Sequence, residues 1–266
     1  MTAADLVRKS QDAYDREDYE EAEALARRAL MMDPLSIDAK QVLSGALIEQ
    51  SRYDEAVPWL QELITQAPDD VISLSDLGLC LFEMCLFDEA EEMLRRALEV
   101  DANDPYANYW MALCVEQRGH LDLADEYFAR ANEIDPNACA KPSRVRREDF
   151  DKVVQQALRE LPEAIRRHLA NVSVIVDELP RREDLTEFEP PLEPSLLGLY
   201  VGVPLPDRSL ADPPRLPDRI YIYKRNLERI CPDRETLLEQ IRITVLHEIG
   251  HYLGWDEDDL AERGYA

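Results

Sequence analysis

The sequence lacks several features, and each absence excludes a class of protein. No stretch of about 18 residues is free of charge, so we expect no membrane-spanning helix. Residues 1–9 lack the apolar core of a secretory signal, which predicts a cytoplasmic protein. Basic residues are scarce, with 30 Lys and Arg against 56 Asp and Glu. The net charge of −26 argues against binding to nucleic acid or to a membrane, because phosphate contacts need clustered positive charge.

Cysteine pairs with the spacing of a metal site are also missing. The chain has five cysteines, an odd number, and none of them forms a C-x-x-C pair. We therefore expect reduced and mostly buried thiols, not a disulfide framework or a cysteine-ligated zinc site. The five are Cys80, Cys85, Cys114, Cys139 and Cys231.

Residues 3–138 repeat with a period of 34. Alanines recur in phase at positions 22, 56, 90 and 124, and prolines recur at positions 34, 68 and 136. Small residues at fixed helical positions let two helices approach closely, and a proline ends the second helix of every pair except the third, where Ala102 stands. The period predicts four helix pairs, over residues 3–36, 37–70, 71–104 and 105–138.

This pattern resembles the tetratricopeptide repeat, a helix–turn–helix unit of 34 residues. Gly78 matches the glycine of that family, and Phe128 matches one of its aromatic positions. The resemblance implies an α-solenoid whose concave groove holds a protein or peptide partner. The alternative is an array that only folds and has no partner of its own.

The second half of the chain has a different pattern. Residues 139–148 break the period and concentrate basic residues, which indicates a linker. Residues 149–266 combine helical and strand patterns, so the expected fold is mainly α, an α-solenoid followed by a small α+β domain. The pattern predicts helices over 150–169, near 225–230 and from Asp233 onward, strands over 172–176, 197–203 and 220–223, and irregular loops over 180–196 and 204–218.

Residues 247–251 read His-Glu-Ile-Gly-His and contain two of the four histidines in the chain. Positions i and i+4 share a face of a helix, so His247 and His251 can direct two imidazoles at one zinc ion. Glu248 is then placed to take a proton from a water that the metal activates. The alternative is a chance match on a structural helix, and the scarcity of histidine makes that interpretation the weaker one.

The motif extends to H-E-x-x-H-x-x-G-x-x-E, with Glu257 as the candidate third ligand. Gly254 suits a left-handed turn that ends the helix, so the chain can fold back and bring Glu257 to the ion. Asp256 is the competing third ligand, and Glu257 could instead be an ordinary acid in the first turn of a short last helix. Two histidines and one carboxylate leave the fourth tetrahedral position to water. Candidate donors to the oxyanion are Tyr223 and Tyr265, each with plain packing as the alternative.

The stretch from about residue 149 to the C-terminus resembles a family of minimal bacterial zincin-like proteins. Residues 196–205, 216–220, 244–257 and 260–265 carry the resemblance. It implies a compact α+β domain with a zinc site and a metallopeptidase activity, although the family usually has aspartate where Glu257 stands. All six methionines lie at or before position 111 and only nine residues follow Glu257, so the methionine turn and the C-terminal subdomain of metzincins have no counterpart.

These patterns together predict a zinc metallopeptidase whose substrate or partner is recruited by the groove of the repeats. The strand at 220–223 is a second candidate for holding substrate, as an edge that pairs with an extended peptide. The alternative function is a non-catalytic interaction scaffold with a structural or vestigial zinc site. Glu248 discriminates between the two, because a structural site has no need of a carboxylate beside its first histidine.

Overall fold

The computed structural model describes residues 1–169, 172–208 and 217–265, which form two compact units. Unit 1 comprises residues 1–140 and 189–193, and unit 2 comprises residues 141–188 and 194–266. The predicted fold class is confirmed, since an all-helical repeat unit is followed by a smaller unit that contains a sheet. The predicted limits of the repeats, the linker and the second domain stay a prediction. Within the described residues, no helix is long and apolar enough to cross a membrane.

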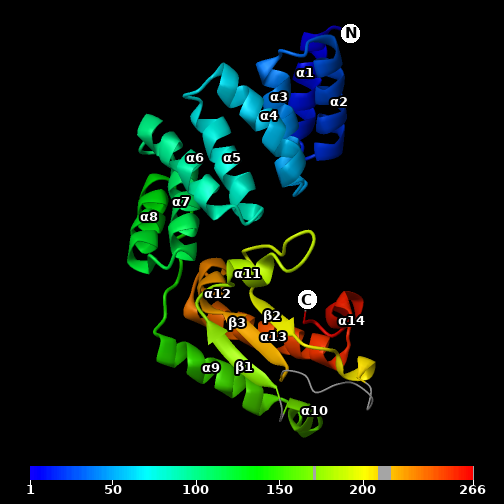
Figure 1. Ribbon diagram of the computed structural model, residues 1–266, viewed down its shortest axis with the longest axis vertical. Coiled ribbons are helices and arrows are strands. Elements are labelled where there is room, and N and C mark those ends of the chain that lie inside the picture. Colours follow the sequence, from blue (N-terminus) through cyan, green and yellow to red (C-terminus); the bar gives the residue numbers. More distant parts are fainter. Residues whose placement is uncertain (170–171, 209–216, 266) are drawn as a thin grey trace. The chain divides into compact units, whose positions relative to one another are not determined.

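Unit 1 is built from helix–turn–helix pairs that follow one another along the chain (Figure 1). The first helices begin at residues 3, 37, 71 and 105 and the second helices at residues 19, 53, 87 and 121, so both sets keep the period of 34. Each helix packs against the next one along the chain, and the first helices of neighbouring pairs also touch. The helices are α1 (Ala3–Tyr14), α2 (Tyr19–Met32), α3 (Ile37–Glu49), α4 (Tyr53–Gln66), α5 (Val71–Glu83), α6 (Phe87–Val100), α7 (Pro105–Gln117) and α8 (Leu121–Ile134).

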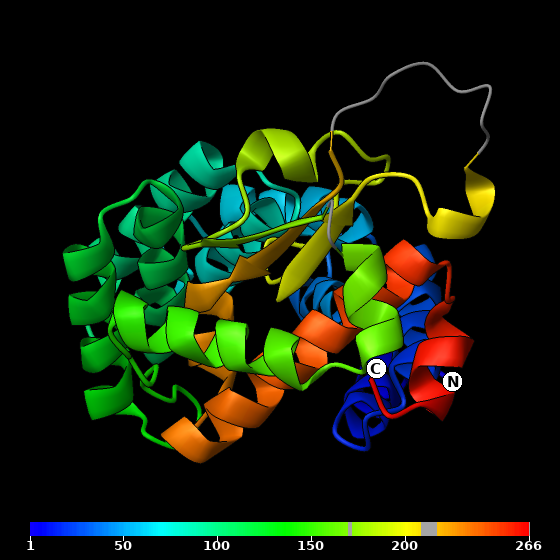
Figure 2. The same cartoon turned by 90° about the horizontal axis from the view of Figure 1, so that it is seen from below.

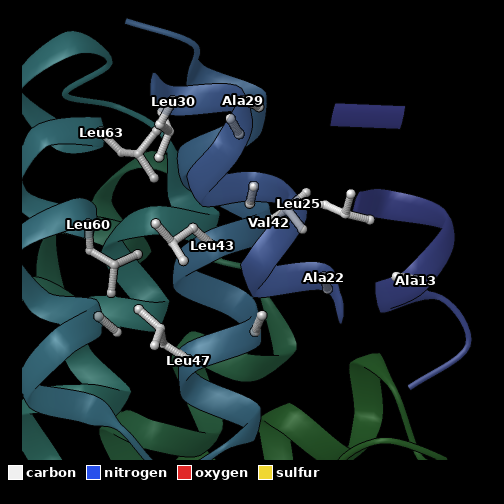
Figure 3. Close-up of a cluster of buried hydrophobic side chains, with 14 of the residues drawn as sticks. Ala13, Ala22, Leu25, Ala29, Leu30, Val42, Leu43, Leu47, Leu60 and Leu63 are labelled. Carbon is white, nitrogen blue, oxygen red and sulfur yellow. The ribbon is translucent and has the colours of Figure 1, made fainter. Parts of the chain in front are cut away.

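The phased small residues lie where the helices of a pair meet. The alanines at 22, 56, 90 and 124 have no exposed surface, and larger side chains such as Leu43 and Leu60 fill the space between neighbouring helices (Figure 3). At Gly78 a Cβ atom would lie 2.5 Å from Cγ of Leu94, so α5 and α6 approach too closely for any side chain at this position. Repetition of this packing gives a continuous cluster of buried side chains from α1 into α5.

The turn inside each helix pair uses one residue in the left-handed conformation. These residues are Glu17, Ser51, Cys85 and Gly119, again 34 apart, with φ of 62°, 56°, 59° and 80°. The residue after each one donates its N–H to a carbonyl five positions earlier, as Asp18 does to Ala13 at 3.0 Å. Only the fourth turn has the glycine that this conformation favours. At Glu17, Ser51 and Cys85 the residue type does not predict this conformation.

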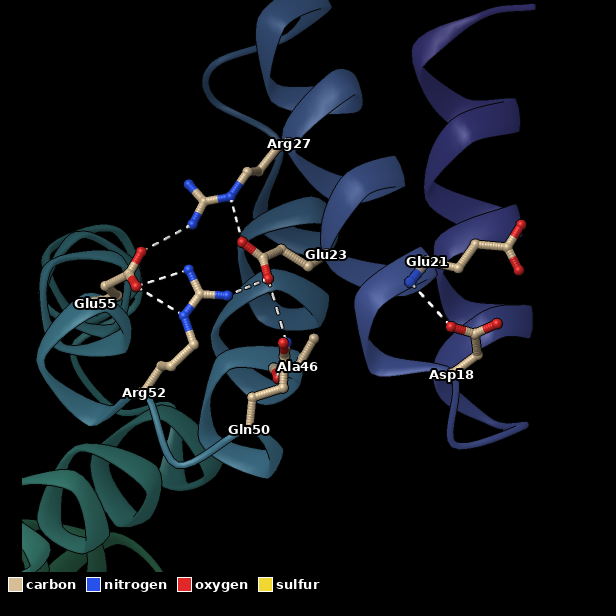
Figure 4. A network of polar contacts seen from close by, with 8 residues as sticks. All are labelled: Asp18, Glu21, Glu23, Arg27, Ala46, Gln50, Arg52 and Glu55. Atoms are coloured by element: carbon tan, nitrogen blue, oxygen red, sulfur yellow. Dashed lines mark hydrogen bonds and ion pairs between the residues drawn. The ribbon is translucent and has the colours of Figure 1, made fainter.

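A network of charged side chains joins the first two repeats (Figure 4). The carboxylate of Glu23 on α2 accepts hydrogen bonds from Arg27 Nε at 2.7 Å, Arg52 Nη1 at 2.5 Å and Gln50 Nε2 at 3.2 Å. Glu55 on α4 accepts from Arg52 Nε at 2.7 Å and Arg27 Nη2 at 3.3 Å. The two carboxylates and two guanidinium groups thus connect α2, the C-terminal end of α3 and α4.

Replacing Glu23 by glutamine should lower the free energy of unfolding by about 1 kcal/mol at pH 7. Burial raises the pKa of Glu23, but the hydrogen bonds from Arg27, Arg52 and Gln50 outweigh it and hold this pKa below its ordinary value of 4.5. A pKa that is lower in the folded state stabilises the protein above pH 4.5, and this contribution disappears as the pH falls through the folded value. Urea denaturation at pH 7 and at successively lower pH should show the difference from wild type shrinking below pH 4.5.

The matched control for this experiment is Glu20→Gln, an exposed residue on the same helix. It should unfold like the wild type at every pH. A Glu23→Gln deficit that stays constant down to the acid range would contradict the assignment of the stabilisation to the ionised carboxylate.

Unit 2 combines a three-stranded sheet with helices (Figure 2). In order along the chain these are α9 (Arg147–Glu160), α10 (Glu163–His168), β1 (Ser173–Asp177), α11 (Arg182–Leu185), β2 (Gly198–Val201), η2 (Leu205–Asp207), β3 (Arg219–Tyr223), α12 (Lys224–Ile230), α13 (Arg234–Leu253) and α14 (Glu257–Glu262). The three predicted strands are confirmed, with limits that differ by one to a few residues. Of the loop predicted over 204–218, residues 209–216 lie outside the described part.

The strand order is β1-β3-β2, with β1 parallel and β2 antiparallel to β3. The prediction that residues 220–223 form an edge strand is therefore wrong. β3 has a neighbour on each side, and both Ile220 and Ile222 are fully buried, so its backbone cannot pair with a substrate. On the side of β2, the edge is β2 itself, which packs against α13.

The core of unit 2 lies between the sheet and the helices α9 and α13, which pack side by side (Figure 2). Phe150 and Val154 of α9 share this core with Ile241 and Val245 of α13. Asp233 is the N-cap of α13, because its Oδ1 accepts a hydrogen bond from Thr236 N at 2.9 Å. Leu237 faces inward, whereas the neighbouring Leu238 is 37% exposed.

Candidate metal centre

His247 and His251 lie one turn apart near the C-terminal end of α13. Their Nε2 atoms are 3.0 Å from each other, and both rings are partly exposed. This is the geometry that the i, i+4 spacing predicts for two ligands on one helix face. Both histidines are therefore carried by α13, a helix whose inward face packs in the core of unit 2.

The chain reverses direction directly after the second histidine. Gly254 has a φ of 85° and donates its N–H to His251 O, while Trp255 N donates to Gly250 O, both at 3.0 Å. A Cβ atom on Gly250 would lie 2.4 Å from Leu260 Cδ2 and 2.9 Å from Trp255 Cε3. Gly254 thus supplies the left-handed turn, and Gly250 leaves the room that α14 needs to pack back onto α13.

This reversal places the two candidate third ligands differently. Glu257 Oε1 lies 3.4 Å from His251 Nε2 and 3.9 Å from His247 Nε2. Asp256 instead caps α14, since its Oδ1 accepts a hydrogen bond from Asp259 N at 2.9 Å. The carboxylate next to the two rings is therefore that of Glu257, although Glu257 is also the first residue of a helix.

The three side chains fit the requirements of a zinc ion. Zinc binds nitrogen and oxygen ligands at about 2.0–2.2 Å in a tetrahedron, which sets its ligand atoms roughly 3.3 Å apart. The observed separations of 3.0, 3.4 and 3.9 Å bracket that value. Within the described residues, His247, His251 and Glu257 are the group of side chains whose ligand atoms gather in this way.

The surroundings of both histidines favour the neutral form of the ring that binds a metal ion. His247 Nδ1 lies 2.7 Å from the backbone oxygen of Tyr265, which can only accept, so Nδ1 carries the proton and the lone pair of Nε2 faces the centre. Burial lowers the pKa of His251, and the neighbouring His247 lowers it further, so this ring is neutral at pH 7. The neutral imidazole is the form that binds metal.

The carboxylate of Glu248 lies against the edge strand β2. A Cβ atom on Gly198 would lie 2.7 Å from Glu248 Oε1, and the backbone N–H of Tyr200 donates a hydrogen bond to the same carboxylate. Burial raises the pKa of Glu248, the Tyr200 N–H lowers it and the charge of Glu257 raises it, and the net result is a pKa of about 8. β2 thus holds Glu248 in one position beside the histidines.

The register of β2 shows which of its backbone groups face this carboxylate. Leu197 O accepts a hydrogen bond from Tyr223 N at 2.9 Å, and Leu199 is paired with Tyr221. Because the backbone groups alternate in direction along an antiparallel strand, Gly198 and Tyr200 direct theirs to the free edge. The hydrogen bond from Tyr200 N–H to Glu248 agrees with this assignment.

A pocket of about 210 Å³ adjoins the centre. Leu196, Leu197 and Ile243 give it a largely apolar wall, and His247 and Glu248 form its other end. The two tyrosines considered as oxyanion donors are placed differently. Tyr265 lines the pocket, whereas Tyr223 is fully buried and is not part of the lining.

The structure also assigns positions that the sequence did not signal. The carbonyl of Tyr265 orients His247, and Gly198 leaves the space that Glu248 occupies. Neither contact follows from a local pattern, because each joins α13 to a residue at least 18 positions away.

Comparisons with known proteins match both halves of the chain. A family model described as a zincin-like metallopeptidase matches residues 169–265, and two tetratricopeptide-repeat models match residues 13–78 and 76–138. No functionally curated protein matches the chain in sequence. Among solved structures, MamA MSR-1 C2 is 24% identical with a TM-score of 0.46, covering 52% of this chain and 79% of its own. MamA 41-end from Desulfovibrio magneticus RS-1 is 19% identical with a TM-score of 0.47, covering 50% and 76%.

Proposed function

We propose that this chain, in which tetratricopeptide repeats precede a zincin-like metallopeptidase domain, is a zinc-dependent peptidase. The observation that carries the proposal is that the ligand atoms of His247, His251 and Glu257 lie within 4.8 Å of one another. Glu248 directly follows the first of these histidines on the same helix. In this proposal the first three residues hold the metal and Glu248 is the catalytic carboxylate.

The chemistry divides between the metal and the protein. A bound zinc ion supplies Lewis acidity, which activates a water molecule and polarises the carbonyl of the scissile peptide bond. The positive charge of a bound zinc ion would favour the ionised form of Glu248. In that form Glu248 accepts the proton that the attacking water loses and delivers it to the nitrogen of the leaving amine. Tyr200 N–H and the space at Gly198 keep the Glu248 carboxylate in place for both transfers.

The edge strand β2 is the proposed binding site for the substrate backbone. An extended peptide can pair with the N–H and carbonyl of Gly198 and with the carbonyl of Tyr200, which face the free edge; the N–H of Tyr200 is already bonded to Glu248. The apolar pocket beside His247 has room for one aliphatic or small aromatic side chain. The substrate would then be fixed by its main chain and selected by one side chain.

In the same proposal, the repeats are the part of the chain that recruits a protein or peptide. Tetratricopeptide repeats support protein–protein interaction in general, and we place the docking site on the first helices of the repeats. A cytoplasmic location is also proposed, because five buried cysteines in the thiol form suit a reducing compartment. Cell fractionation that finds the protein outside the cytoplasm would contradict that part.

Zinc content is the measurement that tests the metal site. Purified protein should contain about one zinc per chain by elemental analysis, and His247→Ala should contain close to none, because two ligands hold zinc far more weakly than three. His120→Ala, which removes an exposed histidine from unit 1, is the matched control and should keep its metal. A wild-type protein that stays free of zinc after incubation with the ion at neutral pH would leave a repeat scaffold as the better account.

Gly198→Ala should reduce peptide hydrolysis by about 10- to 100-fold while the zinc content stays at the wild-type value. The added Cβ meets the flexible end of Glu248, so the fold can accommodate it by displacing the carboxylate. Val201→Ala on the same strand removes an exposed side chain and should leave the rate unchanged. Equal rates for Gly198→Ala and wild type would show that the position of Glu248 does not limit the reaction.

A further inference from the structure

Unit 1 contains a cavity of about 380 Å³ that involves the first helix of every repeat. Tyr14 comes from α1, Glu49 from α3, Asp76 from α5 and Trp110 from α7. The four repeats therefore contribute side chains to one cavity. It is separate from the zinc centre, whose residues all belong to unit 2.

The cavity combines negative charge with aromatic and aliphatic walls. Glu49, Asp76 and Asp104 all line it, and no lysine, arginine or histidine does. Tyr14, Trp110 and Leu79 supply apolar surface between the acids. This pairing of carboxylates with aromatic faces is the one that binds a cation carried on an apolar stem.

Two polar groups of the cavity lack a partner within the described residues. The carboxylate of Asp76 makes no hydrogen bond or ion pair, and only other acids act on its charge. Ser75 also lines the cavity, and its hydroxyl is buried without a hydrogen-bond partner, with 5% of the residue exposed. Buried hydroxyl groups are nearly always paired, so the unpaired hydroxyl of Ser75, next to the partly exposed carboxylate of Asp76, indicates a missing ligand.

We propose that this cavity binds the side chain of an arginine or lysine in an extended segment of a partner protein. The aliphatic stem lies against Tyr14 and Trp110, and the cationic head group donates to Asp76 and Ser75. The inference rests on the docking part of the proposed function and is independent of the zinc chemistry. It narrows the partner from any protein to one with an accessible basic segment.

The electrostatics of the cavity add a dependence on pH. Burial, together with the charges of Asp70, Asp104 and Glu49, raises the pKa of Asp76 to about 7. The other titratable groups near Asp76 are Tyr14, which donates to Glu49 Oε1 at 3.4 Å, Cys80 on the same helix, and Tyr106. A bound cation favours the ionised form of Asp76, so binding should be weak at pH 6 and strengthen up to pH 8.

The test is calorimetric titration of the full chain with a blocked pentapeptide of sequence Ala-Leu-Arg-Leu-Ala. The same peptide with glutamine or glutamate in place of arginine is the ligand control. We expect the arginine peptide to bind at least tenfold more tightly than either control at pH 8, and to quench the fluorescence of Trp110. Equal affinity for the arginine and glutamine peptides, or no binding up to millimolar concentration, would overturn the proposal.

Protein variants locate the binding site. Asp76→Asn keeps the shape of the side chain and should lose about tenfold or more in affinity, together with the pH dependence. Asp69→Asn, an exposed acid in the preceding turn, should change neither. His247→Ala should bind the arginine peptide like the wild type, so loss of the zinc function and loss of peptide binding are distinguished. Unchanged affinity in a folded Asp76→Asn protein would contradict the site.

Discussion

Glu248→Gln should keep its zinc and its fold and lose about 10²- to 10⁴-fold in the rate of peptide hydrolysis. Glutamine matches glutamate in size, so it can still fill the space beside Gly198. It cannot accept the proton that the attacking water must lose. The effect is expected on the rate of the chemical step, because the three proposed ligands are unchanged.

The measurement is cleavage of a blocked peptide library, with new amino termini identified by mass spectrometry, beside zinc content and circular dichroism. Glu239→Gln, an exposed carboxylate on the same helix, is the control and should cleave like the wild type. Full activity in Glu248→Gln would refute the assigned role. A wild-type protein that binds zinc and cleaves no peptide in the library would favour the scaffold function.

Glu228→Ala should lower the free energy of unfolding of unit 2 by about 3–5 kcal/mol, the usual cost of breaking a buried ion pair from one side. Glu228 is fully buried and accepts from Lys224 Nζ at 2.6 Å, Val145 N at 2.8 Å and Arg144 Nη1 at 3.3 Å. Its removal leaves the Lys224 ammonium, itself almost fully buried, with Glu178 at 3.8 Å as its remaining acidic neighbour. The loss comes mainly from this uncompensated charge.

Glu228 also fixes the segment that enters unit 2. Val145 donates to its carboxylate and Ser143 N donates to its backbone oxygen at 3.0 Å, so the predicted linker 139–148 is bound to α12 over part of its length. Denaturation should be followed by the fluorescence of Trp255 in variants in which the tryptophans of unit 1 are replaced, since two units need not unfold together. Glu178→Gln, a partly exposed carboxylate of the same cluster, should cost less than 1 kcal/mol. A loss below about 1 kcal/mol for Glu228→Ala would contradict the assigned cost of the buried charge.

The repeat array could be predicted in most of its detail from the sequence. The period of 34 in alanine and proline predicted helices that begin at the same spacing, and the phased alanines are fully buried. The left-handed residue in each turn was missed, because Glu17, Ser51 and Cys85 occupy a conformation that glycine usually marks. The packing of the repeats forces this conformation on side chains that do not favour it.

The metal site could also be predicted only in part from the sequence. The spacing of His247, His251 and Glu257 is local, and the helix and the turn at Gly254 convert it directly into geometry. The position of Glu248 against Gly198 and the contact of His247 with Tyr265 depend on which distant segments meet. Periodicity in the sequence does not predict which distant segments meet.

The sequence by itself determined the helix pairs, the strands and the candidate ligands, since helical and strand periods and short spacings act over a few residues. Only the tertiary structure decided that β3 is central and β2 is the edge beside Glu248. It also decided that residues of four repeats line one cavity, and that Glu228 is buried among cations. Strand order and burial are set by contacts between residues far apart in the chain, and a single sequence records those contacts in no local pattern.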